Sequence, residues 1–127
     1  MEILEIIDKQ LNDVLKIPYQ LGQWNSDVIY PYSVGELTED PPTTEDGHKT
    51  STLLITAFHR GEGAMLKLLE VKERIENHFN SIYGLRGETE KGAFVICYDS
   101  SFFVPTGEAD LKKIQINLSI QEWKGAV

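Results

Sequence analysis

The chain has 127 residues, the usual length of a single domain built around one hydrophobic core. A hydrophobic fraction of 41% and a charged fraction of 25% are ordinary globular usage and exclude a chain that is disordered throughout. Its 12 basic and 20 acidic residues give a net charge of −8, which repels phosphate backbones and anionic lipids. We therefore expect no specific nucleic-acid binding and no membrane contact.

Targeting signals are also missing from the sequence. No apolar run approaches the roughly 18 residues needed to cross a bilayer. The N-terminus has no basic region followed by an apolar block, so we expect no signal peptide and a cytoplasmic protein. The one cysteine, Cys97, lies among Val95, Ile96 and Tyr98, which predicts a buried thiol in a strand.

The first 34 residues predict a helix, a loop and a strand. Apolar residues from Leu4 to Leu15 recur at helical spacing, and Pro18 ends the helix near Lys16. Residues 19–27 are predicted to form a connecting loop. Alternating apolar residues then predict a strand over 28–34, which Pro31 places at a sheet edge because proline has no N–H to donate.

The segment 36–50 is rich in acidic residues, proline, threonine and glycine. Its apolar content is too low to offset the entropy of ordering, so it predicts an exposed, mobile loop. Loops of that length in a small domain are often functional. We expect a partner-binding loop, with these candidate residues: Glu39, Asp40, Glu45, Asp46 and His48, together with Arg60 beyond the next strand.

The second half of the chain predicts further strands around one helix. Residues 53–58 and 94–98 are apolar at consecutive positions, as in central strands covered on both faces. Between them, an apolar stripe from Ala64 through Phe79 to Ile82 predicts a helix. Strict alternation from Ile114 to Ile120 predicts a last strand with one face exposed to water.

These elements, in the order αββαββ, predict an α+β fold. We expect one domain, residues 1–127, with a mixed sheet of four to five strands and two helices packed on one face. Two helices cannot cover both faces of strands that are apolar on both sides, and a second copy of the chain is the simplest cover for the other face. The candidate oligomer-interface residues are Tyr30, Tyr32, Leu54, Phe58, Ile96 and Trp123.

Motifs for catalysis or metal binding do not emerge. His48, His59 and His78 share no ligand spacing, and Ser100 and Ser101 lack the glycines of a nucleophile elbow. The turn at Gly61 to Gly63 has neither a third glycine nor a P-loop lysine, so it starts a helix rather than binding phosphate. We expect no enzymatic activity, no metal and no cofactor.

Several stretches together resemble the tail-terminator or tail-completion proteins of long-tailed bacteriophages and prophages. They are the opening amphipathic helix, Tyr30-Pro31-Tyr32, the acidic loop running to Asp46-Gly47, the strand from Leu54 to Gly61, and Lys72-Glu73-Arg74-Ile75. The likeness covers nearly the whole chain. It implies a non-enzymatic virion assembly protein that forms a ring, commonly a hexamer, capping the tail tube and joining it to the head.

The resemblance implies tail-tube and head-tail connector proteins as partners, and a path from the bacterial host cytoplasm to the virion tail. Three alternatives stay open at this point. Another head-tail connector component would also form a ring but would bind a different neighbour. A small ferredoxin-like ligand-binding or regulatory domain has similar strand and helix counts and would need a defined pocket. A cytosolic enzyme is the third.

Overall fold

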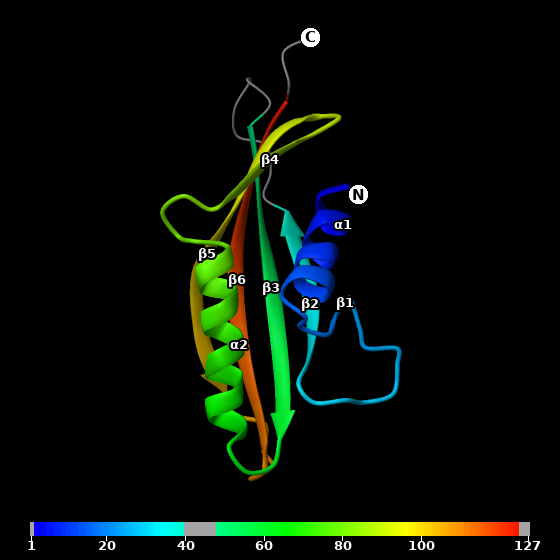
Figure 1. The fold of residues 1–127 in the computed structure, drawn as a ribbon, viewed down its shortest axis with the longest axis vertical. Helices are drawn as coiled ribbons and strands as arrows, with labels where there is room; N and C mark the ends of the chain where they lie inside the picture. Colours follow the sequence, from blue (N-terminus) through cyan, green and yellow to red (C-terminus); the bar gives the residue numbers. More distant parts are fainter. Residues whose placement is uncertain (1, 40–47, 125–127) are drawn as a thin grey trace.

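The computed structural model describes residues 2–39 and 48–124. Their strands form one six-stranded sheet in the order β1-β2-β3-β6-β5-β4 (Figure 1). Every neighbouring pair is antiparallel except β1 and β2. The elements are α1 (Glu2–Lys9), a π-helical turn (Gln10–Val14), β1 (Tyr19–Leu21), β2 (Tyr32–Glu39), β3 (His48–Arg60), α2 (Ala64–His78), β4 (Leu85–Thr89), β5 (Gly92–Val104) and β6 (Leu111–Lys124).

The predicted four- to five-stranded sheet in the order αββαββ is wrong. The described elements are two helices with their π-helical turn and six strands. The additional strands are β1, which lies in the segment predicted as a loop, and β4, which follows the second helix where no strand was predicted. β1 has only three residues, and β4 contains Gly87, so neither shows a clear alternating pattern. The edge predicted for the segment around Pro31 belongs instead to β1.

The predicted loop 36–50 is also shorter than expected. Glu36 to Glu39 continue β2, and residues 48–50 begin β3. Residues 36–39 pair with residues 51–54 of β3, and residues 48–50 pair with β6, so backbone hydrogen bonding extends both ladders beyond the most apolar positions. Residues 40–47, including the candidates Asp40, Glu45 and Asp46, lie outside the described residues.

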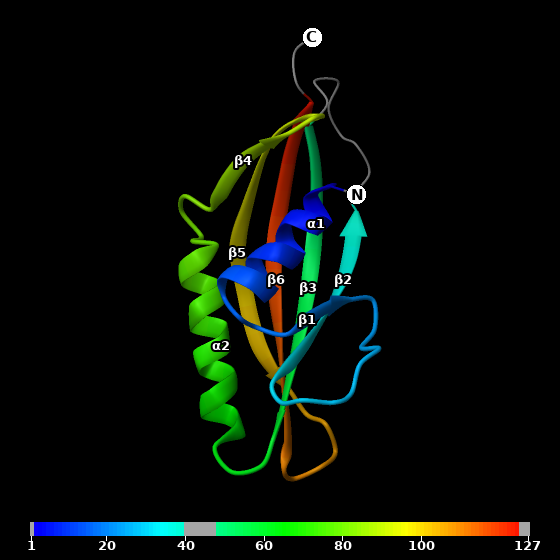
Figure 2. The ribbon, with the colours of Figure 1, turned by 45° about the vertical axis from the view of Figure 1, so that its right-hand side comes forward.

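The core lies between the sheet and the two helices, which lie on the same side of it (Figures 1 and 2). β3 points Leu53, Ile55 and Ala57 into the core, and β6 and β5 contribute alternate residues in the same way. The helices add the following fully or nearly fully buried residues: Ile3, Ile7, Leu11, Leu68, Val71 and Ile75.

β1 is too short to be held by backbone pairing alone, and side-chain contacts fix its position. The Asn12 amide accepts from the Tyr19 N–H and donates to the Tyr19 carbonyl, both at 3.0 Å. The Tyr19 ring is buried over Gly35 of β2, where any Cβ would collide with the ring. The helical segment and the edge strand are thereby fixed to each other.

The C-terminal end of α2 is anchored to β5. Phe79 is fully buried, and its carbonyl accepts a hydrogen bond from the Tyr98 N–H. The helix ends at His78, so Ile82, predicted on its buried stripe, is 75% exposed. The chain then turns through Gly84, which has a φ of +67° and lies against β5.

Replacing Gly84 tests how tightly this turn packs. An alanine Cβ would lie 2.6 Å from the Cys97 Sγ and 2.8 Å from the Ile96 carbonyl oxygen. Gly107 has a similar φ of +84° and nothing within 4 Å, so Gly107→Ala carries the conformational penalty alone. We expect Gly84→Ala to lower the free energy of unfolding by about 1–3 kcal/mol more than Gly107→Ala, measured by urea denaturation. Equal effects would show that the turn moves away from β5 freely.

Candidate interaction surface

The face of the sheet opposite the helices is called the open face here. Its side chains alternate with the core residues, so β3 contributes Thr52, Leu54, Thr56 and Phe58. All four are half-buried, since neighbours in adjacent strands shield them in part. Within residues 2–39 and 48–124, no helix lies over this face (Figure 2).

One end of the open face carries a cluster of aromatic rings. Phe58 and Tyr32 face each other across β3 and β2 with ring centroids 4.9 Å apart. Trp24 and Tyr30 extend the cluster, at 5.0 Å and 5.7 Å from the Tyr32 ring. Three of the predicted interface residues, Tyr30, Tyr32 and Phe58, therefore lie together, with Leu54 further along the same strand.

The middle of the open face is polar. β6 places Gln115, Asn117, Ser119 and Gln121 there, as its alternation predicts. Trp123 lies at the far end, with its ring stacked on His48 at 5.0 Å. Predicted interface residues thus occur at both ends of a face with a hydrophilic centre.

Two strand residues have the opposite placement to the one expected. Ile96 is fully buried beneath the helices, so it is a core residue and not part of an exposed interface. Cys97, predicted to be buried, is half-exposed and pairs with Ser119 on the open face. A run of consecutive apolar residues cannot show which face is covered, since either register of alternation fits it.

Of the predicted partner-binding residues that the structure describes, Arg60 lies far from Glu39 and His48. His48 and Arg60 occupy the two ends of the 13-residue strand β3, about 40 Å apart at the usual rise of a strand. Glu39 lies near the His48 end and pairs with Lys49 at 3.1 Å. Nothing in the described part of the chain joins Arg60 to that acidic segment.

Arg60 instead fastens the turn between β5 and β6. Its Nη1 donates to both carboxylate oxygens of Asp110 at 2.9 Å, and its Nη2 lies 2.6 Å from Glu108. Its Nε donates to the Tyr30 hydroxyl at 3.4 Å, and these bonds raise the pKa of the guanidinium. With its donors engaged, Arg60 is a structural residue of this turn rather than an anion ligand.

Three histidines occupy separate places. His48 is at the start of β3, and its Nε2 lies 3.3 Å from the Gln121 side-chain oxygen. His59 is at the end of β3 beside Tyr30. His78 ends α2, with Nε2 2.6 Å from the Gln10 side-chain oxygen, and burial lowers its pKa. Among the described residues, no three His, Cys, Asp or Glu side chains are grouped so as to hold a metal ion.

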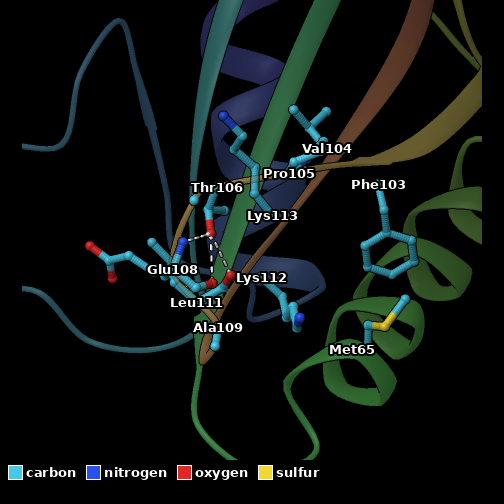
Figure 3. Close-up of a pocket in the computed structure, with 11 residues that line it drawn as sticks. Met65, Phe103, Val104, Pro105, Thr106, Glu108, Ala109, Leu111, Lys112 and Lys113 are labelled. Carbon is cyan, nitrogen blue, oxygen red and sulfur yellow. Dashed lines mark hydrogen bonds between the residues drawn. The ribbon is translucent and has the colours of Figure 1, made fainter.

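A hollow of about 480 Å³ lies near the start of α2 (Figure 3). Its lining includes the apolar residues Met65, Phe103 and Val104, together with Lys112 and Lys113. Thr106 donates to the carbonyl of Leu111 at 2.8 Å and so shapes its floor. Glu108 also lines the hollow, and its carboxylate lies 2.6 Å from the Arg60 Nη2.

No protein-family model and no curated protein matches the chain. No helix in the described residues has both the length and the apolar character to span a bilayer.

The sequence analysis missed parts of this surface. Trp24 is not among the residues predicted for the interface, yet its ring joins the Tyr32 cluster. Phe102 is 50% exposed on the open face, because a bulge between Tyr98 and Ser100 resets the alternation of β5.

The lowered pKa of His78 predicts a pH dependence of stability. Because burial favours its neutral form, the unfolded chain takes up a proton at higher pH than the folded chain does. His78 should therefore lower stability as pH falls below about 6.5, down to its folded-state pKa. We expect His78→Gln to flatten the pH dependence of the urea midpoint between pH 7 and 5. Parallel profiles for variant and wild type would contradict this.

Proposed function

We propose that the chain is a non-enzymatic assembly subunit that self-associates through its open face and sheet edges into a ring. We further propose that this ring is a phage tail terminator, which caps the tail tube and joins it to the head. The tail identity rests on the sequence resemblance. The ring rests on one structural observation, namely the open face with its aromatic cluster.

The open face supports this proposal by its composition. Phe58, Tyr32 and Trp24 form a rigid aromatic group, and tyrosine and tryptophan are enriched where protein surfaces meet. Polar residues of β6 beside them do not argue against an interface, since interfaces other than those of obligate dimers are about as apolar as the rest of a protein surface. A second copy of the chain is the simplest partner that offers matching geometry.

The net charge of −8 is compatible with the same role. A ring at the end of a tail must let DNA pass through its channel without holding it. An acidic wall repels phosphate groups, whereas a basic wall would retain them. The charge thus favours a channel-forming subunit over a nucleic-acid-binding one.

A charge placed within the aromatic cluster tests self-association. We expect Phe58→Asp to weaken oligomer formation at least tenfold in sedimentation or light scattering, because it inserts a carboxylate into an apolar contact. Ile82→Asp, at a 75% exposed position outside the open face, is the matched control and should assemble as wild type does. Circular dichroism spectra should be measured to check that both variants remain folded.

The thiol of Cys97 gives an independent readout, since it lies half-exposed on the open face. Its labelling rate should fall as wild-type protein concentration rises, and Phe58→Asp should abolish that protection. The ring proposal is wrong if wild-type protein stays monomeric at high concentration and also fails to bind purified tail tubes. Assembly without tail-tube binding would instead favour another head-tail connector role.

A further inference from the structure

The outer edge of β5 is uncovered beyond the end of β4. β4 pairs with β5 only from Gly92 to Ile96, whereas β5 continues to Val104. Every second residue of a strand turns its N–H and C=O away from a given neighbour. The Tyr98 N–H donates a hydrogen bond to the Phe79 carbonyl. No described residue forms a hydrogen bond with the outward-facing backbone N–H and C=O groups of residues 100–104. Such an edge is a template for another strand.

Helix α2 overhangs this open edge. Its buried stripe faces the sheet, and the flank on the β5 side carries Met65 and Leu69, which are 48% and 37% exposed. Two contacts fix the direction of this flank: the Lys72 ammonium lies 5.6 Å from the Tyr98 ring centroid, and Met65 shares the hollow with Phe103. Figure 3 shows Met65 and Phe103 side by side.

We call the open edge of residues 100–104, with Met65 and Leu69 above it, the edge slot. A strand added here would place alternate side chains beneath Met65 and Leu69, where their apolar surface would be buried away from water. Its other side chains would lie next to Phe102, on the open face. The slot therefore offers both backbone hydrogen bonds and apolar cover, the two requirements of strand addition.

A second open edge occurs at the opposite side of the sheet, on β2. β1 covers β2 only at residues 33–35, where the Ser33 N–H donates to Pro18 and the Gly35 carbonyl accepts from Gly22. By alternation, Leu37 and Glu39 also turn their backbone groups outward, and no described strand covers them. This segment has the length and conformation of the strand that the edge slot lacks.

Charge distinguishes the two edges. The β2 segment carries Glu36 and Glu39, of which Glu39 is paired with Lys49. Lys112 and Lys113 line the hollow at the Val104 end of the slot, and the Glu108 that also lines it is paired with Arg60. Opposite charges on two surfaces of the same chain favour head-to-tail contact between copies. The open segments lie at opposite ends of the sheet (Figure 1), so joined copies are staggered along the strands, as strands are around a closed barrel.

We propose that the edge slot of one copy receives the outer edge of residues 36–39 of β2 from the next copy. The sheet then continues across the subunit boundary. This inference rests on the proposed ring and specifies which edges close it.

Charge variants on α2 test the slot. We expect Leu69→Glu to weaken self-association at least tenfold, because it puts a carboxylate where apolar side chains of the added strand would lie. Leu66→Glu is the matched control, since Leu66 is 68% exposed on the same helix and lies about 100° around the helix axis from Met65, outside the flank that Met65 and Leu69 share. Both positions are solvent-exposed in the subunit, so both variants should keep the wild-type melting temperature.

A proline on β2 tests the other edge. Glu39→Pro removes an outward N–H without removing a hydrogen bond to β3, and should weaken self-association as Leu69→Glu does. Glu39→Ala loses the same ion pair with Lys49 but keeps the N–H, so it should assemble normally.

Mixing the two defective variants makes the test specific. Leu69→Glu retains an intact β2 edge and Glu39→Pro retains an intact slot, so an equimolar mixture should form heterodimers while each alone stays monomeric. If the wild type and Leu69→Glu both form rings while Phe58→Asp does not, the slot inference is wrong and the ring stands. If wild-type protein does not associate at all, the slot inference is wrong, and the ring proposal is wrong as well if the protein also fails to bind purified tail tubes.

Discussion

The antiparallel ladder between β3 and β6 is the constraint on which the rest of the structure depends. It pairs all 13 residues of β3 with β6 in one unbroken register. Because side chains alternate along both strands, this register puts Ile55 and Ile116 on the same face and Thr56 and Gln115 on the other. A slip of one residue would expose the whole core, so the pattern fixes both where the helices pack and which face stays open.

The open face and the open edges have the same origin. α1 and α2 cover one side of the two central strands, and β1 and β4 are too short to cover the full length of their neighbours. The backbone of β2 and β5 beyond them remains available on the two sides of the sheet. A monomeric protein usually blocks such edges with charges, bulges or proline. Here a bulge in β5 lies just before the exposed segment and leaves residues 100–104 extended.

Sequence reasoning predicted the elements that have strong periodicity. The alternation from Ile114 to Ile120 and the stripe from Ala64 to Phe79 are both buried as their spacing indicates. It missed β1, because Asn12 and the space over Gly35 fix that strand and neither leaves a local pattern. It also placed Ile96 on the interface, since five consecutive apolar residues fit either face until tertiary contacts choose one. The Arg60 contacts with Glu108 and Asp110 depend on a turn some fifty residues away along the chain, which no local pattern reveals.

Charge restricts how copies of this chain can meet. At −8 each, two copies repel at long range, and only local complementarity or apolar burial can offset that repulsion. A twofold contact through the β2 edges would set Glu36 and Glu39 against their own counterparts, and one through the slots would set lysines against lysines. A head-to-tail contact brings the unlike edges together at every boundary. In the proposed assembly such contacts leave one free edge of each kind until the chain of subunits closes, so the charges that disfavour a twofold dimer are compatible with the proposed ring.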